Sequence, residues 1–195
     1  HAELQLQNSS IVDSSARYGG ALQLESASTA WLEGLEIADC SATEDGGGLI
    51  VSGQSTVSIM GTTIVRCSAK NGGALAVSAS TAMLRLTLLA NNVAERAGGG
   101  VFSEGSRILL AEQTAVVGNL ASTSGRALAL MIGSTTTYQL PAPPGRWIAG
   151  SKCAVYREDC PWLGVAPARY QEERCLQTAA QCQLEANVTA VVDGV

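Results

Sequence analysis

Near-identical strings of small and aliphatic residues recur at an almost constant interval along this chain. They are GGAL at 19–22, GGGL at 46–49, GGAL at 72–75, GGGV at 98–101 and a diverged copy, GRAL, at 125–128. The copies begin 27, 26, 26 and 27 residues apart. A period this short and regular predicts a solenoid, in which each repeat stacks on the next, instead of a single closed globule.

Within one repeat, apolar and polar residues alternate in three short runs. In the unit at 19–45 the apolar pairs are Leu22 with Leu24, Ala30 with Leu32, and Leu35 with Ile37. Clusters of Ser, Thr, Gly, Asp and Glu separate the runs, and no 3.6-residue period is sustained. The sequence therefore predicts an all-β fold, a parallel β-helix of about five coils of 26–27 residues with three short strands per coil. The crossover rule for parallel strands predicts that the coil is right-handed.

Alignment of the repeats gives four apolar columns, which we expect to face a dry core. The first two columns are Leu22, Leu49, Leu75, Val101 and Leu128, and then Ala30, Val57, Ala82 and Ile108. The other two are Leu32, Ile59, Leu84 and Leu110, and then Ile11, Ile37, Ile64, Leu88 and Val116. Because Leu4 and Leu6 align with Ala30 and Leu32, we expect the sequence to open in the middle of a coil of a longer protein.

A column of small polar residues is expected at one corner of the coil, three residues after the last inward aliphatic. Its members are Ser14, Cys40, Cys67, Asn91 and Asn119. Such side chains can hydrogen-bond the bend amides and one another. Cys40 and Cys67 are expected one coil apart, where the Cα atoms suit a disulfide but the Cβ atoms lie beyond the ideal of about 3.8 Å. A strained bridge and two buried free thiols both remain open.

Composition changes after about residue 137, which divides the chain into β-helix repeats at 1–137 and a capping and linker segment at 138–195. All five Pro, two of the three Trp and four of the six Cys lie in this second part, and three of the Pro fall within 141–144. We expect Tyr138, Trp147 and Trp162 to cover the open end of the β-helix. Cys153, Cys160, Cys175 and Cys182 predict an irregular, disulfide-stapled segment with three possible pairings, of which the local one is favoured. A zinc site is the alternative, although no Cys-x2-Cys is present and the only His is His1.

Charge and sequon positions bear on partners and on compartment. The formal net charge is −5 with no Lys/Arg cluster, which argues against nucleic acid as a partner. No stretch approaches the roughly 18 apolar residues that a membrane span needs. Asn8 and Asn187 begin Asn-x-Ser/Thr sequons and are glycosylation candidates. With the cysteines, they favour the secretory pathway and an extracellular or cell-surface location.

The sequence offers little that is typical of a catalytic or metal site. The exposed acidic and basic residues alternate in sign and do not gather at one level of the predicted rod, so we expect no enzyme activity, no cofactor and no metal. Glu44 and Asp45 form an acidic corner that could attract calcium, but the following corners are Lys70-Asn71 and Glu95-Arg96, so the acid is not repeated. The GGGL and GGGV strings lack the Lys-Ser/Thr of a phosphate-binding loop.

The pattern GGAL, then Ile-x-x-Cys or Asn, then GGAL resembles the repeat of the polymorphic outer membrane proteins over about residues 1–132. In that family an aromatic Phe precedes the corner Asn; here aliphatic residues replace the Phe, and Asn is kept at Asn91 and Asn119. The family comprises bacterial surface adhesins, and similar repeats occur in very large surface proteins of algae and protists. In those proteins a segment like Tyr138 to Trp147 and Cys-rich modules follow the repeats, which favours the eukaryotic type.

These observations predict a non-catalytic extracellular or cell-surface structural module, a stiff rod within a larger multi-module protein. Its expected partners are other modules of the same chain or protein subunits of a surface assembly, with glycans as a further class. The alternatives are a carbohydrate-binding or adhesin module and a polysaccharide-degrading enzyme that uses Glu36 or Asp39. Binding to glycans would distinguish the first alternative, and turnover of polyuronates the second.

Overall fold

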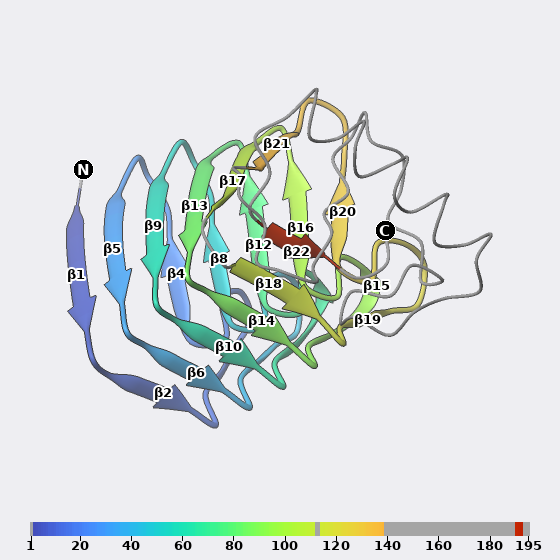
Figure 1. The fold of residues 1–195 in the computed structure, drawn as a ribbon, viewed down its shortest axis with the longest axis horizontal. Helices are drawn as coiled ribbons and strands as arrows, with labels where there is room; N and C mark the ends of the chain where they lie inside the picture. The colour runs from blue at the N-terminus through green and yellow to red at the C-terminus, as the bar shows by residue number, and fades with distance from the viewer. Residues whose placement is uncertain (1, 112–113, 139–189, 193–195) are drawn as a thin grey trace, which may run out of the picture.

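The computed structural model describes residues 2–111, 114–138 and 190–192, and these form a parallel β-helix of about five coils (Figure 1). Successive coils follow one another along the long axis of the molecule, from β1 at the N-terminal end. Every strand pairing is parallel and joins a strand to its counterpart in the next coil. The all-β, parallel β-helix expected from the repeat is therefore confirmed.

Four sheets run along the β-helix, and we name them in the order in which the chain meets them. Sheet A contains β1 (Glu3–Gln7), β5 (Thr29–Glu33), β9 (Thr56–Met60), β13 (Thr81–Arg85), β17 (Arg107–Ala111) and β21 (Thr135–Tyr138). Sheet B contains β2 (Ser10–Val12), β6 (Glu36–Ala38), β10 (Thr63–Val65), β14 (Leu88–Ala90), β18 (Thr114–Val117) and β22 (Ala190–Val192).

The other two sheets have five strands each. Sheet C contains β3 (Ser15–Ala16), β7 (Ser41–Ala42), β11 (Ser68–Asn71), β15 (Val93–Ala97) and β19 (Leu120–Ala121). Sheet D contains β4 (Leu22–Leu24), β8 (Leu49–Val51), β12 (Leu75–Ser78), β16 (Val101–Glu104) and β20 (Leu128–Leu130). The three strands expected per coil are those of sheets A, B and D, and sheet C adds a fourth strand, which has only two residues in β3, β7 and β19.

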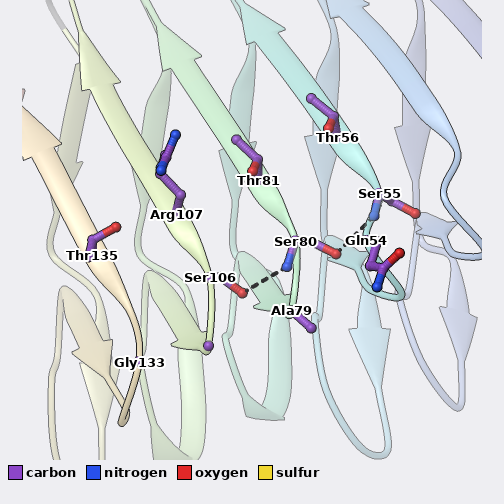
Figure 2. Close-up of a pocket in the computed structure, with 11 residues that line it drawn as sticks. Gln54, Ser55, Thr56, Ala79, Ser80, Thr81, Ser106, Arg107, Gly133 and Thr135 are labelled. Atoms are coloured by element: carbon purple, nitrogen blue, oxygen red, sulfur yellow. Dashed lines mark hydrogen bonds between the residues drawn. The ribbon is translucent and has the colours of Figure 1, made fainter.

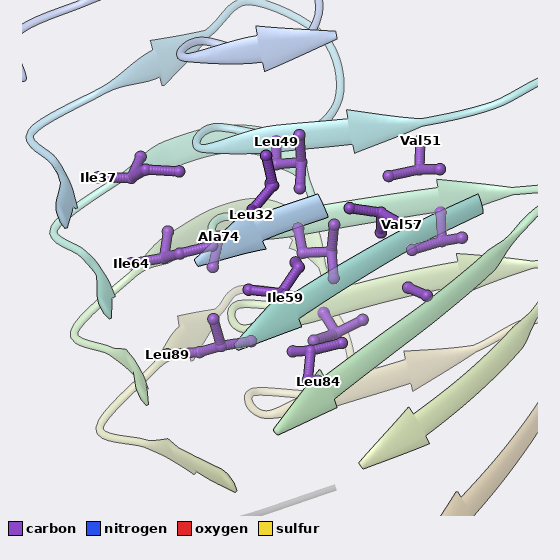
Figure 3. Packing of buried hydrophobic residues seen from close by; sticks show 14 of the residues in the cluster. Leu32, Ile37, Leu49, Val51, Val57, Ile59, Ile64, Ala74, Leu84 and Leu89 are labelled. Atoms are coloured by element: carbon purple, nitrogen blue, oxygen red, sulfur yellow. The ribbon is translucent and has the colours of Figure 1, made fainter. Parts of the chain in front are cut away.

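Apolar side chains from successive coils stack into one continuous core, which Figure 3 shows from close by. The register pairs Leu49 with Leu75, Val57 with Ala82 and Ile59 with Leu84, and all six side chains are fully buried. Burying this surface supplies the main stabilising free energy, at about 25 cal/mol per Å² of apolar area. Three of the four predicted apolar columns have the predicted register.

The fourth column contains one error, because Leu89 and not Leu88 continues the line from Ile64 to Val116. Ile64 pairs with Leu89, which pairs with Val116, and Leu89 is fully buried while Leu88 is 36% exposed. The strand of sheet A in this coil starts 25 residues after the previous one, since Thr56 pairs with Thr81. A register shift between Ala69 and Asn71, opposite β15, restores the spacing before the next glycine pair.

The glycine pairs form the tight corner between sheets C and D. Gly46 has φ +73°, a left-handed conformation that side chains disfavour. A Cβ at the next residue, Gly47, would collide with the backbone carbonyl oxygens of Gly73 and Ser68 in the neighbouring coil. Close approach of adjacent coils therefore requires glycine at the corner, which explains why the pair recurs.

The predicted boundary at residue 137 stays a prediction. β21 continues sheet A as far as Tyr138, and β22, near the C-terminus, pairs in parallel with β18 through Ala190 opposite Thr114. Residues 147, 153, 160, 162, 175, 182 and 187, to which the sequence assigned capping, disulfide and glycosylation roles, lie outside the described residues.

Candidate functional site

The outer face of sheet A is the surface on which polar side chains from several coils come together. Its strands alternate between buried and solvent-facing residues. The register aligns Thr29, Thr56, Thr81, Arg107 and Thr135 in one outward column at the start of the strands. Glu3 of β1 begins the same column, four threonines follow, and Arg107 interrupts them between Thr81 and Thr135.

An open groove of about 510 Å³ lies over this end of the strands, as Figure 2 shows. It is lined by residues 54–56, 79–81 and 105–107, together with Gly133 and Thr135. The groove therefore runs across the strands and takes equivalent residues from four successive coils. Its lining is mainly hydroxyl, amide and guanidinium groups.

A ladder of buried serines fixes the turn beneath the groove. The hydroxyl of Ser55 accepts a hydrogen bond from the backbone N–H of Ser28 (3.1 Å), and that of Ser80 accepts one from Ser55 (3.1 Å). Ser106 continues the series with a 3.2 Å bond from the N–H of Ser80, and its own hydroxyl donates to the carbonyl of Glu104. These bonds satisfy bend amides that would otherwise be buried without a partner. The groove consequently has a fixed floor.

Arg107 is the charged residue of the groove lining. Its backbone pairs with Thr81 on one side and Thr135 on the other, and its side chain is exposed. Among the described residues, no hydrogen bond or ion pair engages its guanidinium. The five N–H donors of this group are therefore available to a ligand.

A second outward column on the same face carries apolar groups. Trp31 pairs with Ser58, which pairs with Met83, which pairs with Leu109. The Trp31 side chain is 43% exposed and Met83 is 37% exposed. An exposed indole on a flat sheet, two residues along the strand from the threonine column, is a surface on which a sugar ring can stack.

Of the two acidic residues considered for catalysis, Asp39 is paired with an arginine of the next coil. Asp39 accepts two hydrogen bonds from Arg66, at 2.7 and 2.8 Å, and this partner lowers the pKa of the Asp39 carboxyl. Glu36 is exposed on β6 of sheet B. The geometry thus gives Asp39 a role in linking two coils, and solvent screens an exposed pair of this kind, so that it contributes little to stability.

The acidic corner considered for calcium is also engaged between coils. Glu44 forms an ion pair of 2.9 Å with Lys70, which lowers the pKa of its carboxyl, and Asp45 accepts a hydrogen bond from Asn71. Within the described part of the chain, no cluster of three or more His, Cys, Asp or Glu has a metal-binding arrangement. Residues of this corner therefore link coils to one another.

The polar corner column exists, but Asn91 is not a member of it. The column is Ser14, Cys40, Cys67, Asn92 and Asn119, with Asn92 fully buried and Asn91 exposed. Asn92 Oδ1 accepts from the N–H of Cys67 at 2.9 Å, and Asn119 Oδ1 accepts from the N–H of Asn92 at 2.9 Å. The same one-residue shift that replaces Leu88 by Leu89 displaces Asn91, which instead takes a left-handed bend at φ 55°.

Cys40 and Cys67 are free and buried in this column. Cys40 Sγ donates to the carbonyl of Ala38 at 3.3 Å, and Cys67 Sγ donates to that of Val65 at 3.4 Å. Burial raises the pKa of the Cys67 thiol to about 12. Both residues therefore act as small core groups that satisfy local carbonyls.

Asn8, the glycosylation candidate within the described residues, is exposed at a bend. Its φ is 47°, and its N–H donates to the carbonyl of Glu33 in the next coil. The position thus meets the expectation of exposure on a turn, while glycosylation itself stays a prediction.

The groove residues were missed in the sequence because they are polar and lie outside the apolar columns by which the repeats were aligned. The available signal was the threonine that begins β5, β9, β13 and β21 of sheet A, with Arg107 in place of threonine at the start of β17. No helix in the described residues has the length and apolar character needed to cross a bilayer. Comparisons of the chain with protein-family models, with curated proteins and with solved structures give no match.

Proposed function

We propose that the chain is a non-catalytic structural module of the cell surface or extracellular space, a stiff β-helical rod within a larger multi-module protein. The observation that carries this proposal is the continuity of the hydrogen-bond ladders at the corners. Serine and asparagine side chains bond from coil to coil on columns that flank the core. Cross-linking of every coil to the next resists bending more than a core alone would.

Ion pairs on the surface support the same role. Arg66 to Asp39 and Lys70 to Glu44 each join neighbouring coils. Partners of the rod would be other modules of the same chain or protein subunits of a surface assembly. The net charge of −5 keeps such a rod from self-association.

Two measurements test the proposal. Hydrogen exchange should find the amides of all four sheets protected through the central coils, because each is bonded to the coils on both sides. Antibodies against residues 1–137 should label intact, unpermeabilised cells that express the full-length protein. Rapid exchange across the central coils would contradict stiffness, and labelling that requires permeabilisation would contradict a surface location.

A second candidate function is a carbohydrate-binding or adhesive module that uses sheet A. The observation that favours it is exposed Trp31 beside a polar groove on a flat sheet. A glycan array should show binding that Trp31→Ala weakens, since stacking on an aromatic face is lost. Val12→Ala, which removes an exposed apolar residue from β2 of sheet B, is the matched control and should bind as the unaltered protein does. If no glycan on the array binds, the carbohydrate-binding function is contradicted and the structural role is the one that remains.

A further inference from the structure

The groove over sheet A holds a cation, Arg107, whose guanidinium has no hydrogen bond or ion pair among the described residues and lies among hydroxyl groups. Arg107 occupies the outward column that Thr56, Thr81 and Thr135 otherwise form. We propose that this groove binds a linear acidic polysaccharide, with the Arg107 guanidinium contacting a carboxylate or sulfate group of the sugar chain. This inference deepens the second candidate function and rests on it.

The residues that line the groove recur from coil to coil along the axis of the rod, just as the sugar units of a polysaccharide recur along its chain. Equivalent residues of adjacent coils lie about 4.8 Å apart, a distance close to the length of one sugar ring. A chain lying across the strands would meet the same kind of donor and acceptor at each step: Thr56, Thr81 and Thr135 hydroxyls, and the Gln54 amide at the edge. Open, hydroxyl-lined grooves suit an extended polymer better than a small compact molecule.

The charge distribution on sheet A indicates which part of the face an acidic chain would choose. The two arginines of the sheet, Arg85 and Arg107, lie on β13 and β17. The acidic residues at its other end, Glu3 and Glu33, lie on β1 and β5. Positive charge therefore increases toward the coils that form the groove, and negative charge lies away from it.

Arg107 can supply the strongest contact of the site. A guanidinium offers two parallel N–H donors that match a carboxylate or a sulfate, and such charge-assisted bonds are about twice as strong as neutral ones. Glu104, the nearest acidic residue in sequence, belongs to β16 of sheet D, across the turn, and no ion pair among the described residues joins it to Arg107. The serine ladder below the groove holds the backbone of Ser106, so the start of β17 is already fixed before a ligand arrives.

Arg107→Thr is the decisive variant, because it installs the residue that the same column carries in other coils and should leave the fold intact. Arg96→Thr removes the same charge from exposed β15 in sheet C and is the matched control. The probes are oligogalacturonate, its fully methyl-esterified form, dextran sulfate and neutral dextran, each titrated calorimetrically into the whole protein. Circular dichroism and thermal melting establish that both variants remain folded.

We expect oligogalacturonate or dextran sulfate to bind, and the preferred one of the two identifies the acidic group. Methyl esterification or the use of neutral dextran should weaken binding at least about tenfold, and so should Arg107→Thr, while Arg96→Thr should not. Higher salt should weaken the binding as well. Equal binding of neutral and acidic probes with no effect of Arg107→Thr would overturn the acidic specificity yet leave carbohydrate binding standing. Absence of binding by all four probes would overturn both.

Discussion

At the scale of single residues, the stacking of coils buries some side chains and so makes them unreactive. Cys67 is fully buried, its Sγ donates to the carbonyl of Val65, and burial raises its pKa to about 12. The thiolate, which is the reactive form, is therefore almost absent at neutral pH. The residue contributes to packing and to bend hydrogen bonding instead of to redox chemistry.

This pKa shift makes stability depend on alkaline pH. The unfolded chain releases the Cys67 proton near the ordinary value of 9.0, whereas the folded chain keeps it until about 12. The stability contributed by the buried thiol is therefore complete below pH 9 and is lost as the pH rises toward 12. We expect urea titrations under reducing conditions to show a larger loss of unfolding free energy between pH 9 and pH 11 for the unaltered protein than for Cys67→Val. Parallel curves for the two proteins would contradict a buried, protonated thiol.

The inward and outward residues of sheet B should differ sharply in their tolerance of substitution. Ile64 is fully buried in the core, whereas Glu36 is exposed on the neighbouring strand. We expect Ile64→Asp to cost about 4 kcal/mol or more of unfolding free energy, because a carboxyl group in a dry layer has no partner. Glu36→Ala should change that free energy by less than about 0.5 kcal/mol. Urea titration and limited proteolysis measure both, and equal resistance of the two variants would show that the assignment of faces is wrong.

At the scale of elements, corner ladders set the spacing of the strands that they connect. Asn92 is the central member of the ladder that joins Cys67 to Asn119. Its side chain accepts from the Cys67 N–H, donates to the Ile64 carbonyl and donates to Asn119 Oδ1. It therefore connects three coils through one amide group.

Replacement of Asn92 tests how much the ladder contributes to the free energy of unfolding. We expect Asn92→Ala to lower the unfolding free energy by about 2–3 kcal/mol, because a buried N–H and a buried carbonyl lose their partners. Asn91→Gly is the natural control, since Asn91 is exposed and its φ of 55° suits glycine, so its effect should stay within about 0.5 kcal/mol. Thermal and urea unfolding give both values. A larger effect at Asn91 than at Asn92 would restore the register that the repeat alone suggested.

Asn91 and Asn92 show which part of the structure the sequence could predict and which part it could not. The repeat predicted parallel coils and three apolar columns correctly, because glycine pairs and buried aliphatic residues have to recur at each coil. It failed at Leu88 and Asn91, where each correct residue has a neighbour of the same kind, so residue type could not show that the counterparts of Ile64 and Cys67 lie 25 and not 24 residues later. Sheet C was missed because strands such as β7, with two residues, are too short to show alternation. The groove was missed because its lining is polar, whereas the apolar residues were the ones that defined the repeat.

At the scale of the whole molecule, the β-helix is a series of similar units, each bonded mainly to its two neighbours. Stability should then be close to a sum of coil and interface terms. A complete coil is the smallest piece that can be removed without changing the pairing of the remainder. Removal of any other length would place the residues of one sheet opposite those of another.

Deletion of residues 72–97 tests this property. It joins Asn71 to Gly98, which holds in the next coil the place that Gly72 holds in its own, and β8 then lies opposite β16 with Leu49 beside Val101. Asn119 would take over the role of Asn92 toward Cys67, so the corner ladder would remain unbroken. We expect a folded β-rich protein, shorter by about 4.8 Å in small-angle scattering. Deletion of residues 72–84 is the control and should abolish cooperative unfolding, because half a coil puts sheet B residues where sheet D requires its own. Folding of the half-coil deletion in preference to the full one would contradict a stack of equivalent coils.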